Sequence, residues 1–268
     1  MTKLYARFLV AIVKLATGFL GRWRRLTVLA RIHALLAPES TVTVNGISLT
    51  LLVPDRTSVY WPRHGFSSEP NTLSWIDGFQ EGDVLFDVGA NIGAYTLYAA
   101  KARSARVVAF EPNPFSFRVL VHNLQRNGVA ENVTPLCLAA DAETGPAPLF
   151  LKGTDAGSVG HSIGEGGGEE NGFHVQTLAF SLDDLTKTAG LPRPNHMKID
   201  VDGIELPILE GAKSLLSDSR LKSVLVETLT HDEQDREKIG ALLGQCGLAP
   251  DPDWREDGSD NRLFVRAS

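Results

Sequence analysis

The stretch that decides the fold is Val84-Leu-Phe-Asp-Val-Gly-Ala-Asn-Ile-Gly93, an apolar run followed by a loop with two glycines. Its first half predicts a buried strand over Val84–Val88. Gly89 and Gly93 let the backbone turn tightly and approach a ligand, and a helix over Gly93–Arg103 would present unpaired N–H groups at its start. The stretch therefore predicts a strand, a ligand-binding loop and a helix.

Strands and helices alternate after this stretch, which is typical of a parallel sheet wound by crossover helices. The predicted strands are Val84–Val88, Arg106–Phe110, Val133–Leu138, His196–Val201 and Ser223–Glu227, with Arg262–Arg266 closing the sheet in an antiparallel hairpin. The predicted helices are Gly93–Arg103, Pro114–Asn127, Ile204–Leu216 and Asp232–Cys246. We expect an α/β, Rossmann-like fold with a mostly parallel seven-stranded sheet and helices on both faces.

Two further strands interrupt this alternation, at about Ala147–Lys152 and Phe173–Phe180. The connection between them, Gly153 to Gly172, contains eight glycines, too many for a packed element. Its length and composition favour mobility, either as a disordered connection or as a flap near the active site. His161 in this connection is interpreted as a solvated loop histidine.

The residues before the predicted sheet divide into two parts, 1–38 and 39–80, ahead of a catalytic domain over 81–268. Thr41 to Val53 predicts a hairpin that turns at Asn45-Gly46, because this dipeptide tolerates the positive φ angles of a type I′ turn. We expect Tyr60 to Ser68 to be irregular and Asn71 to Phe79 to form a helix.

The first part, residues 3–36, contains no proline and predicts one helix that is weakened at Gly18 and Gly21. At 100° per residue one stripe is apolar, and Lys3, Arg7, Lys14 and Arg25 lie on roughly the opposite side. The stripe consists of Phe8, Ile12, Leu15, Phe19, Trp23 and Leu26. Its apolar runs are too short to cross a bilayer, so we expect it to lie in the plane of an anionic membrane surface. Docking on protein and a cleaved targeting peptide remain alternatives.

The charge distribution supports this division of the chain. The net charge is −6, yet seven basic residues and no acidic one precede Glu39, which leaves 19 basic and 32 acidic residues, about −13, for the remainder. An acidic body argues against nucleic acid as a partner. Only two cysteines are present, Cys137 and Cys246, which favours a reducing compartment. We expect a cytoplasmic protein, peripheral on the inner face of the membrane.

The acidic residue before the glycine loop, Asp87, indicates which cofactor binds. The loop has the spacing GxxxG instead of GxGxxG, and a carboxylate there would repel a dinucleotide pyrophosphate. It would attract the sulfonium and ammonium groups of S-adenosylmethionine. Glu111 ends the second strand, 22 residues after Gly89, where a carboxylate accepts hydrogen bonds from both ribose hydroxyls. A simple helix N-cap acid is the alternative for Glu111.

Two later segments extend the predicted site. Asp141, at the end of Leu138-Ala-Ala-Asp141, would accept the adenine amino group, or alternatively cap the following turn. The segment from Met197 to Ala212 places Asp200 and Asp202 at the end of the fourth strand, where open α/β sheets bind ligands. These acids would bind a hydroxyl donor, orient the acceptor or hold a cation.

The segments DVGANIG, FEPNP, LAAD, KIDVDGIELPILEGA and VLVET together resemble the FkbM family of S-adenosylmethionine-dependent methyltransferases, from about Glu69 to Glu227. The resemblance implies O-methylation of a sugar, glycan or similar metabolite. Asp202 departs from the family, which commonly has glutamate there. The predicted donor-binding residues are Glu69, Asp87, Gly89, Ala90, Asn91, Gly93, Glu111, Pro112, Asn113, Ala140, Asp141 and Asp200.

The catalytic candidates follow from the chemistry of methyl transfer to a hydroxyl, which needs alignment and a general base. Asp200 is the first choice by position and His231 the second, while Glu227 is a substrate or structural carboxylate. Asp202 caps the next helix or joins the site. Lys198 either stabilises an alkoxide or points away from the site. No metal is expected, because no histidine-bearing ligand motif supports one.

Two rival functions remain from the sequence. The first is a nicotinamide-dependent oxidoreductase on a related fold, which the loop spacing and Asp87 disfavour. The second is a non-catalytic membrane adaptor that retains the fold, which the intact set of Asp87, Gly89, Gly93 and Glu111 disfavours.

Overall fold

The computed structural model describes residues 1–163, 173–201, 203–228, 233–255 and 258–266. The predicted site residues Asp202 and His231 lie outside the described residues. The chain forms two compact units, Met1–Glu39 and Ser40–Ser268.

The first unit contains two helices, α1 (Thr2–Ala16) and α2 (Arg22–Leu35). The prediction of one helix over 3–36 is therefore wrong. Thr17 ends the first helix and its hydroxyl donates back to the carbonyl of Val13, while Gly21 is extended, with ψ near 150°, immediately before α2. Glycine loses the most backbone entropy in a helix, so the break falls where the sequence is weakest. Over the described residues, neither helix is long and apolar enough to cross a membrane.

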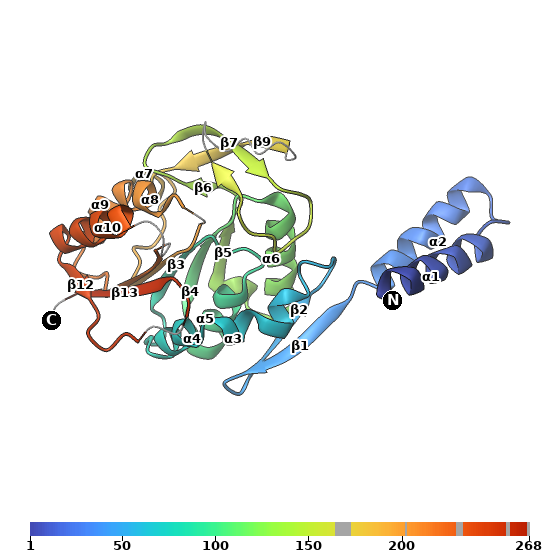
Figure 1. The fold of residues 1–268 in the computed structure, drawn as a ribbon, viewed down its shortest axis with the longest axis horizontal. Coiled ribbons are helices and arrows are strands. Elements are labelled where there is room, and N and C mark those ends of the chain that lie inside the picture. Colours follow the sequence, from blue (N-terminus) through green and yellow to red (C-terminus); the bar gives the residue numbers. More distant parts are fainter. Residues whose placement is uncertain (164–172, 202, 229–232, 256–257, 267–268) are drawn as a thin grey trace. The chain divides into compact units, whose positions relative to one another are not determined.

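The second unit is built on a seven-stranded sheet with strand order β12-β13-β11-β10-β3-β4-β5 (Figure 1). Its strands are β3 (Val84–Val88), β4 (Arg106–Phe110), β5 (Val133–Leu136), β10 (His196–Ile199), β11 (Ser223–Glu227), β12 (Leu248–Pro250) and β13 (Asn261–Arg266). The five central strands are parallel, and β13 runs antiparallel to both β11 and β12. The predicted mostly parallel sheet with an antiparallel closing hairpin is confirmed.

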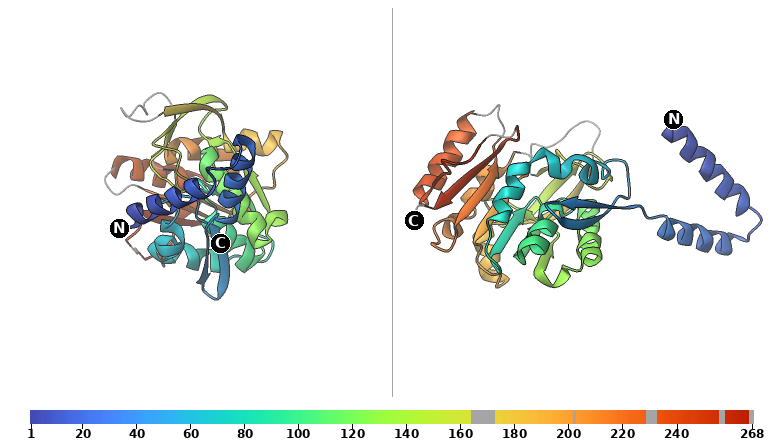
Figure 2. Two further views of the ribbon diagram at one scale, coloured as in Figure 1. Left: turned by 90° about the vertical axis from the view of Figure 1, so that its right-hand side faces the viewer. Right: turned by 90° about the horizontal axis from the view of Figure 1, so that it is seen from below.

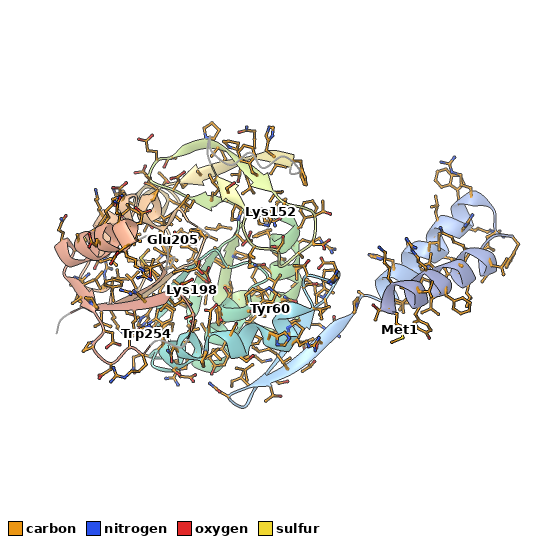
Figure 3. All side chains as sticks on the ribbon, in the orientation of Figure 1. Met1, Tyr60, Lys152, Lys198, Glu205 and Trp254 are labelled. Carbon is orange, nitrogen blue, oxygen red and sulfur yellow. The ribbon has the colours of Figure 1, made fainter. Side chains whose placement is uncertain are left out.

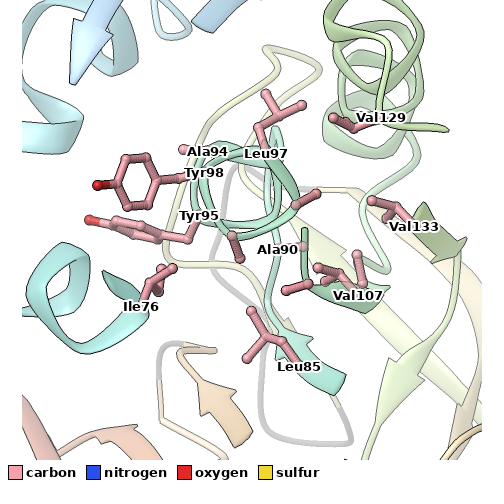
Figure 4. Close-up of a cluster of buried hydrophobic side chains, with 14 of the residues drawn as sticks. Ile76, Leu85, Ala90, Ala94, Tyr95, Leu97, Tyr98, Val107, Val129 and Val133 are labelled. Atoms are coloured by element: carbon pink, nitrogen blue, oxygen red, sulfur yellow. The ribbon is translucent and has the colours of Figure 1, made fainter. Parts of the chain in front are cut away.

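Helices cover both faces of this sheet (Figure 2). One face packs on α4 (Pro70–Asp77), α5 (Ala94–Arg103) and α6 (Pro114–Asn127), and the other packs on α7 (Leu182–Thr188), α8 (Glu205–Glu210), α9 (Lys213–Leu216) and α10 (Glu233–Gln245). Within β3, Leu85 joins the first core, whereas Phe86 joins the second, as the twofold period of a strand requires. Figure 4 shows Tyr95 and Leu97 of α5 among Ile76, Leu85 and Val107.

The hairpin before the sheet matches its prediction. It consists of β1 (Glu39–Val44) and β2 (Ile47–Leu52), joined by Asn45 and Gly46, whose φ angles are 47° and 83°. Asn123 and Asn127 of α6 hydrogen-bond to the backbone of β2, and Leu49 and Leu51 are fully buried in the first core. The hairpin therefore packs against α6 and the first core.

Two segments differ from their prediction: one helix was expected over Ile204–Leu216, and Tyr60 to Ser68 was expected to be irregular. Residues 204–216 form two short helices, α8 and α9, separated at Gly211 and Ala212, and the carbonyl of Gly211 accepts a hydrogen bond from the N–H of Asp183 at 3.0 Å. Asp183 then accepts hydrogen bonds from the N–H groups of Ser214 and Leu215 and caps the second helix. The segment expected to be irregular contains a π-helical turn, η1 (Trp61–Gly65), followed by α3 (Phe66–Ser68).

The inserted strands form a separate sheet with strand order β6-β9-β7-β8. It consists of β6 (Ala139–Ala140), β7 (Gly145–Leu151), β8 (Ser162–Ile163) and β9 (Phe173–Phe180), and a short 3-10 helix, η2 (Ala130–Asn132), precedes β5. Both predicted inserted strands are present. The sequence prediction missed α7, whose N-cap Ser181 accepts a hydrogen bond from the N–H of Asp184.

Candidate active site

A cavity of about 760 Å³ lies at the carboxyl ends of β3, β4, β10 and β11, where an open α/β sheet is expected to bind its ligand. Five of its lining residues are carboxylates: Glu111, Asp200 and Glu227 at the strand ends, Glu69 before α4, and Asp155 in the inserted region. Residues 155–163 of the inserted region line its other side. The cavity wall is therefore acidic near the sheet.

The loop after β3 brings two parallel strand ends together. Gly89 has φ +84°, and a Cβ on it would lie 1.8 Å from the carbonyl oxygen of Asp200. The N–H groups of Gly89 and Ala90 donate to the carbonyl of Phe110 at 3.0 and 2.9 Å. Only glycine fits this position, since it must combine a left-handed backbone with contact to the neighbouring loop.

The carboxylate of Glu111 is held by the backbone on both oxygens. Oε2 accepts from the N–H of Asn91 at 2.7 Å, and Oε1 accepts from the N–H of Asn113 at 2.8 Å. The side chain is buried, with 7% of its surface exposed, and lines the cavity. Its position is fixed before any ligand arrives, which reduces the entropy that binding must overcome.

Asn91 completes this part of the wall. It has a positive φ of 51° and its amide nitrogen reaches the carbonyl of Ser158 at 3.4 Å. Its side-chain oxygen is buried and has no hydrogen-bond partner among the described residues. Because an unpaired buried acceptor costs stability, this oxygen is suited to receive a donor group from a ligand.

His161 enters the cavity from the inserted region, contrary to its interpretation as a solvated histidine. The amide nitrogen of Asn113 lies 3.0 Å from its Nε2, while the amide oxygen of Asn113 accepts from Phe115 N–H and caps α6. Ser158 Oγ lies 2.9 Å from the same nitrogen. The sequence could not reveal this position, because a single histidine in a glycine-rich connection carries no periodic signal.

The described part of that connection is tied to the body of the unit. Ala156 N–H donates to Asp55 at 2.7 Å and Gly157 N–H donates to Ser116 Oγ at 3.1 Å. The hydroxyl of Thr57 donates to Asp155 at 3.1 Å. Residues 155–157 are therefore held against the body of the unit, so of the two predicted alternatives, a disordered connection or a flap near the site, the first does not hold for them. The prediction for residues 164–172 falls outside the described residues.

Asp87 lies beneath the glycine loop and is not among the residues that line the cavity. Its carboxylate accepts a short hydrogen bond from the hydroxyl of Thr96 on α5. Burial raises the pKa of Asp87, against the opposing influence of Lys198 and Thr96. The direct contact with a methyl donor predicted for Asp87 is thus not part of this structure, and its role in binding stays a prediction.

Lys198, in the middle of β10, is fully buried below the cavity (Figure 3). It forms a short ion pair with Asp200, and its ammonium lies 5.0 Å from the centre of the Tyr95 ring. Burial disfavours its charged form, but Asp200, Glu69 and Asp87 outweigh this effect and hold the pKa of Lys198 above its usual range. Lys198 was predicted either to stabilise an alkoxide or to point away from the site. The geometry places it beside Asp200 as a cation.

Two carboxylates reach the cavity from distant parts of the chain. Glu69 precedes α4 and accepts hydrogen bonds from Thr72 Oγ1 at 3.1 Å and from Asn261 Nδ2, on β13, at 2.9 Å. Glu227 ends β11. Asp200 exposes 29% of its side chain to the cavity side, while Lys198 engages its Oδ2 atom. The structure brings these three predicted residues together.

The remaining predicted donor-binding residues divide into two groups. Pro112, Asn113 and Ala140 line the cavity, as do Gly89, Asn91 and Glu111. Ala90, Gly93 and Asp141 are not among the lining residues. Asp141 instead accepts a hydrogen bond from the N–H of Ala142 at 2.7 Å, which matches the alternative of a turn cap. Its predicted contact with adenine is not supported by this position.

The outer end of the cavity has a different character. Arg56, Tyr60 and Trp61 line it, and Tyr60 lies edge-on to Trp61 with ring centres 5.9 Å apart (Tyr60 is labelled in Figure 3). Arg56 is the sole arginine or lysine among the lining residues that the structure describes. The sequence analysis assigned none of these three residues to the site: it expected Tyr60 to Ser68 to be irregular and gave no role to Arg56.

Comparisons with known proteins agree with this geometry. Hexuronic acid methyltransferase AglP of Haloferax volcanii is 32% identical to this chain over 179 residues. The alignment covers 65% of this chain and 66% of AglP, so the chain spans slightly less than two thirds of the length of AglP. 31-O-demethyl-FK506 methyltransferase FkbM of Streptomyces tacrolimicus is 27% identical over 206 residues, 68% of this chain and 75% of that protein.

Solved structures show the same fold. The crystal structure of methyltransferase FkbM from Methylobacillus flagellatus KT aligns with a TM-score of 0.50 at 18% identity, over 70% of this chain and 44% of that one. The family description methyltransferase FkbM domain matches residues 87–248, from the end of β3 to the start of β12. More than half of the sequence is included in this match. The chain therefore belongs to the FkbM family of methyltransferases.

Proposed function

We propose that this protein transfers the methyl group of S-adenosylmethionine to a hydroxyl of a sugar or glycan. The observation that carries the proposal is Glu111, a buried carboxylate at the tip of β4 with each oxygen fixed by a backbone N–H and facing the cavity. A carboxylate oxygen can accept more than one hydrogen bond, and charge-assisted bonds from ribose hydroxyls contribute about 1.5–3 kcal/mol each.

The cavity fits a nucleoside with a positively charged sulfur. Gly89 lines the cavity without a side chain, and the buried oxygen of Asn91 is an acceptor without a partner among the described residues. Glu69, Asp200 and Glu227 surround the region beyond Glu111 with negative charge, and Lys198 offsets only part of it. An acidic wall favours a sulfonium and an ammonium group and disfavours the pyrophosphate of a dinucleotide.

The chain's own residues would position the acceptor and take up its proton. The bound donor supplies a methyl carbon bonded to a sulfonium sulfur; the acceptor oxygen forms the new bond to this carbon as the carbon–sulfur bond breaks. We assign the uptake of the hydroxyl proton to Asp200; its position after β10, with Lys198 holding one of its oxygens, supports this role. His231 remains the alternative base and lies outside the described residues.

The proposed acceptor class follows from the relatives and from the outer end of the cavity. The matched relative AglP is named for methylating a hexuronic acid. In this chain Tyr60 and Trp61 offer aromatic surface to a sugar ring, and Arg56 offers a cation to an acidic substituent. We therefore favour a sugar that carries a carboxylate.

Binding and transfer can be tested separately. S-adenosylhomocysteine should raise the melting temperature of the protein, whereas NAD should leave it unchanged. The protein should then move a labelled methyl group from S-adenosylmethionine to a hexuronate-containing oligosaccharide, and less to its carboxyl-reduced form. Stabilisation by NAD alone would overturn the methyltransferase assignment. Equal transfer to the two sugars would remove the preference for an acidic acceptor.

A further inference from the structure

The unit Met1–Glu39 concentrates the exposed apolar side chains of the protein. Thirteen of the eighteen large hydrophobic residues that are exposed in the described chain lie within its first 36 residues. Neither α1 nor α2 contains a buried residue. Side chains such as Phe8, Leu15, Phe19 and Trp23 expose 60%, 83%, 83% and 73% of their surface. Exposed apolar surface on this scale marks a site of interaction.

Helix α1 arranges its apolar side chains on one side. With about 100° between successive residues, Leu4, Phe8, Ile12 and Leu15 fall within an arc of about 80°. The expected stripe continued through Phe19, Trp23 and Leu26, but the break between α1 and α2 ends it at Leu15. The apolar face is therefore about three turns long and belongs to α1 alone.

Positive charge accompanies this face without a counter-charge. Lys3, Arg7 and Lys14 fall within about 40° of one another and about 120° from the centre of the apolar stripe. Arg22, Arg24, Arg25 and Arg31 belong to α2. No acidic residue precedes Glu39, so the unit carries seven cations and no anion before that position.

We propose that α1 lies in the plane of an anionic lipid bilayer, with its apolar stripe in the acyl boundary and the cations of α1 and α2 among the headgroups. A helix of 15 residues is too short to span the hydrocarbon core, whereas this length suits an interfacial helix. Charge complementarity selects the anionic bilayer over a neutral one, since each cation near such a surface strengthens binding about fivefold.

The test is sedimentation of the full chain with vesicles of phosphatidylcholine alone or with phosphatidylserine. We expect binding to the serine-containing vesicles that weakens in 1 M salt, where charges are screened beyond about 3 Å. The variant Lys3→Glu/Arg7→Glu/Lys14→Glu should bind at least a hundredfold more weakly. Phe8→Ser/Ile12→Ser/Leu15→Ser should also lose binding, although it keeps every cation.

A matched control changes the same amount of charge in the other unit. Arg118→Glu/Lys187→Glu/Lys213→Glu alters three exposed cations of Ser40–Ser268 and should bind vesicles as the unchanged protein does. In all variants S-adenosylhomocysteine should still raise the melting temperature, which shows that the methyltransferase unit is folded.

Three results would overturn the proposal. The first is equal binding to vesicles with and without phosphatidylserine. The second is a loss of binding in the control variant as large as in Lys3→Glu/Arg7→Glu/Lys14→Glu. The third is that the unchanged protein binds no vesicles but self-associates in solution, and that Phe8→Ser/Ile12→Ser/Leu15→Ser abolishes this self-association. The last result would assign the apolar face to a second copy of the chain. Vesicle binding is measured without an acceptor, so its outcome is independent of the proposed methyl transfer.

Discussion

The two ends of strand β10 use polar residues in opposite ways. At its amino end His196 belongs to a closed network: Trp75 Nε1 donates to Ser223 Oγ at 2.8 Å, Ser223 Oγ lies 2.7 Å from Nδ1 of His196, and Nε2 of His196 lies 3.0 Å from Asp83. Lys222 completes it through an ion pair with Asp83 at 2.8 Å. At its carboxyl end Asp200 faces a cavity.

The difference shows which polar groups stabilise the fold and which are available to a ligand. The network at the amino end is buried and satisfied, and the ring of His196 stacks on Phe79 with centres 3.8 Å apart. At the carboxyl end, carboxylates gather around an open volume and the oxygen of Asn91 has no partner among the described residues. In this parallel sheet, the polar groups that stabilise the fold lie at the amino ends of the strands, and those available to a ligand lie at the carboxyl ends.

The largest effect is expected from Gly89→Ala at the carboxyl end. The new Cβ would overlap the carbonyl oxygen of Asp200, so the loops after β3 and β10 would have to separate, at a cost of about 3–5 kcal/mol. Urea denaturation measures the loss of stability. Gly82→Ala is the matched control, since Gly82 has φ +79° and no atom within 4 Å of its added Cβ; it should lose about 1–2 kcal/mol. Equal losses would show that the close approach is not real.

The next largest effect is the loss of folding stability in acid that His196, at the amino end of β10, should cause. Burial lowers the pKa of His196 to about 4, although Asp83 acts to raise it. Between pH 6.5 and 4 the unfolded chain therefore binds a proton that the folded chain excludes. Stability present above pH 6.5 should fall by about 3 kcal/mol as the pH approaches 4.

The variant His196→Gln isolates this contribution, because glutamine does not titrate. Its denaturation free energy, measured at pH 7.0, 5.5 and 4.5, should decline less steeply than that of the unchanged protein. Parallel declines would assign the acid sensitivity to other groups.

A smaller effect is expected from Glu111→Gln at the cavity. The glutamine amide keeps one oxygen acceptor, but its NH₂ group cannot accept the hydrogen bond of the second backbone N–H. The variant also loses the negative charge that strengthens hydrogen bonds to ribose. Calorimetry should show S-adenosylhomocysteine binding about 10- to 100-fold more weakly. Asp141→Asn is the comparison, since Asp141 does not line the cavity and should leave affinity unchanged. Unchanged affinity in Glu111→Gln would remove the main support for the proposed donor site.

The smallest effect is expected at the outer end of the cavity. Arg56→Gln should raise the KM for an acidic sugar about tenfold, the loss of roughly one charge-assisted bond, without altering donor affinity. Arg63→Gln controls for charge, because Arg63 is exposed on the same segment and does not line the cavity. A rise in KM for neutral sugars as well would point to a structural role for Arg56.

Local patterns predicted the elements of the sheet well. The bounds of β3, β4, β9 and β11 agree with the sequence prediction: β3, β4 and β11 are short apolar runs, and β9 alternates polar and apolar residues over much of its length. The turn at Asn45-Gly46 also followed from its chemistry alone. Helix breaks were less predictable. The second of the two helices over 204–216 is capped by Asp183, which lies 31 residues before Ser214 and 32 before Leu215 in the sequence.

By itself, the sequence determined the donor-side framework: a strand, glycine loop and helix, then Glu111 at the next strand tip, because these positions are fixed by spacing along the chain. Only the tertiary structure decided which side chains reach the cavity. It turned Asp87 toward Thr96, brought Lys198 beside Asp200, and carried His161, Arg56 and Tyr60 into the wall. The physical reason is that side-chain direction and burial depend on contacts between segments distant in the sequence, which no local pattern encodes.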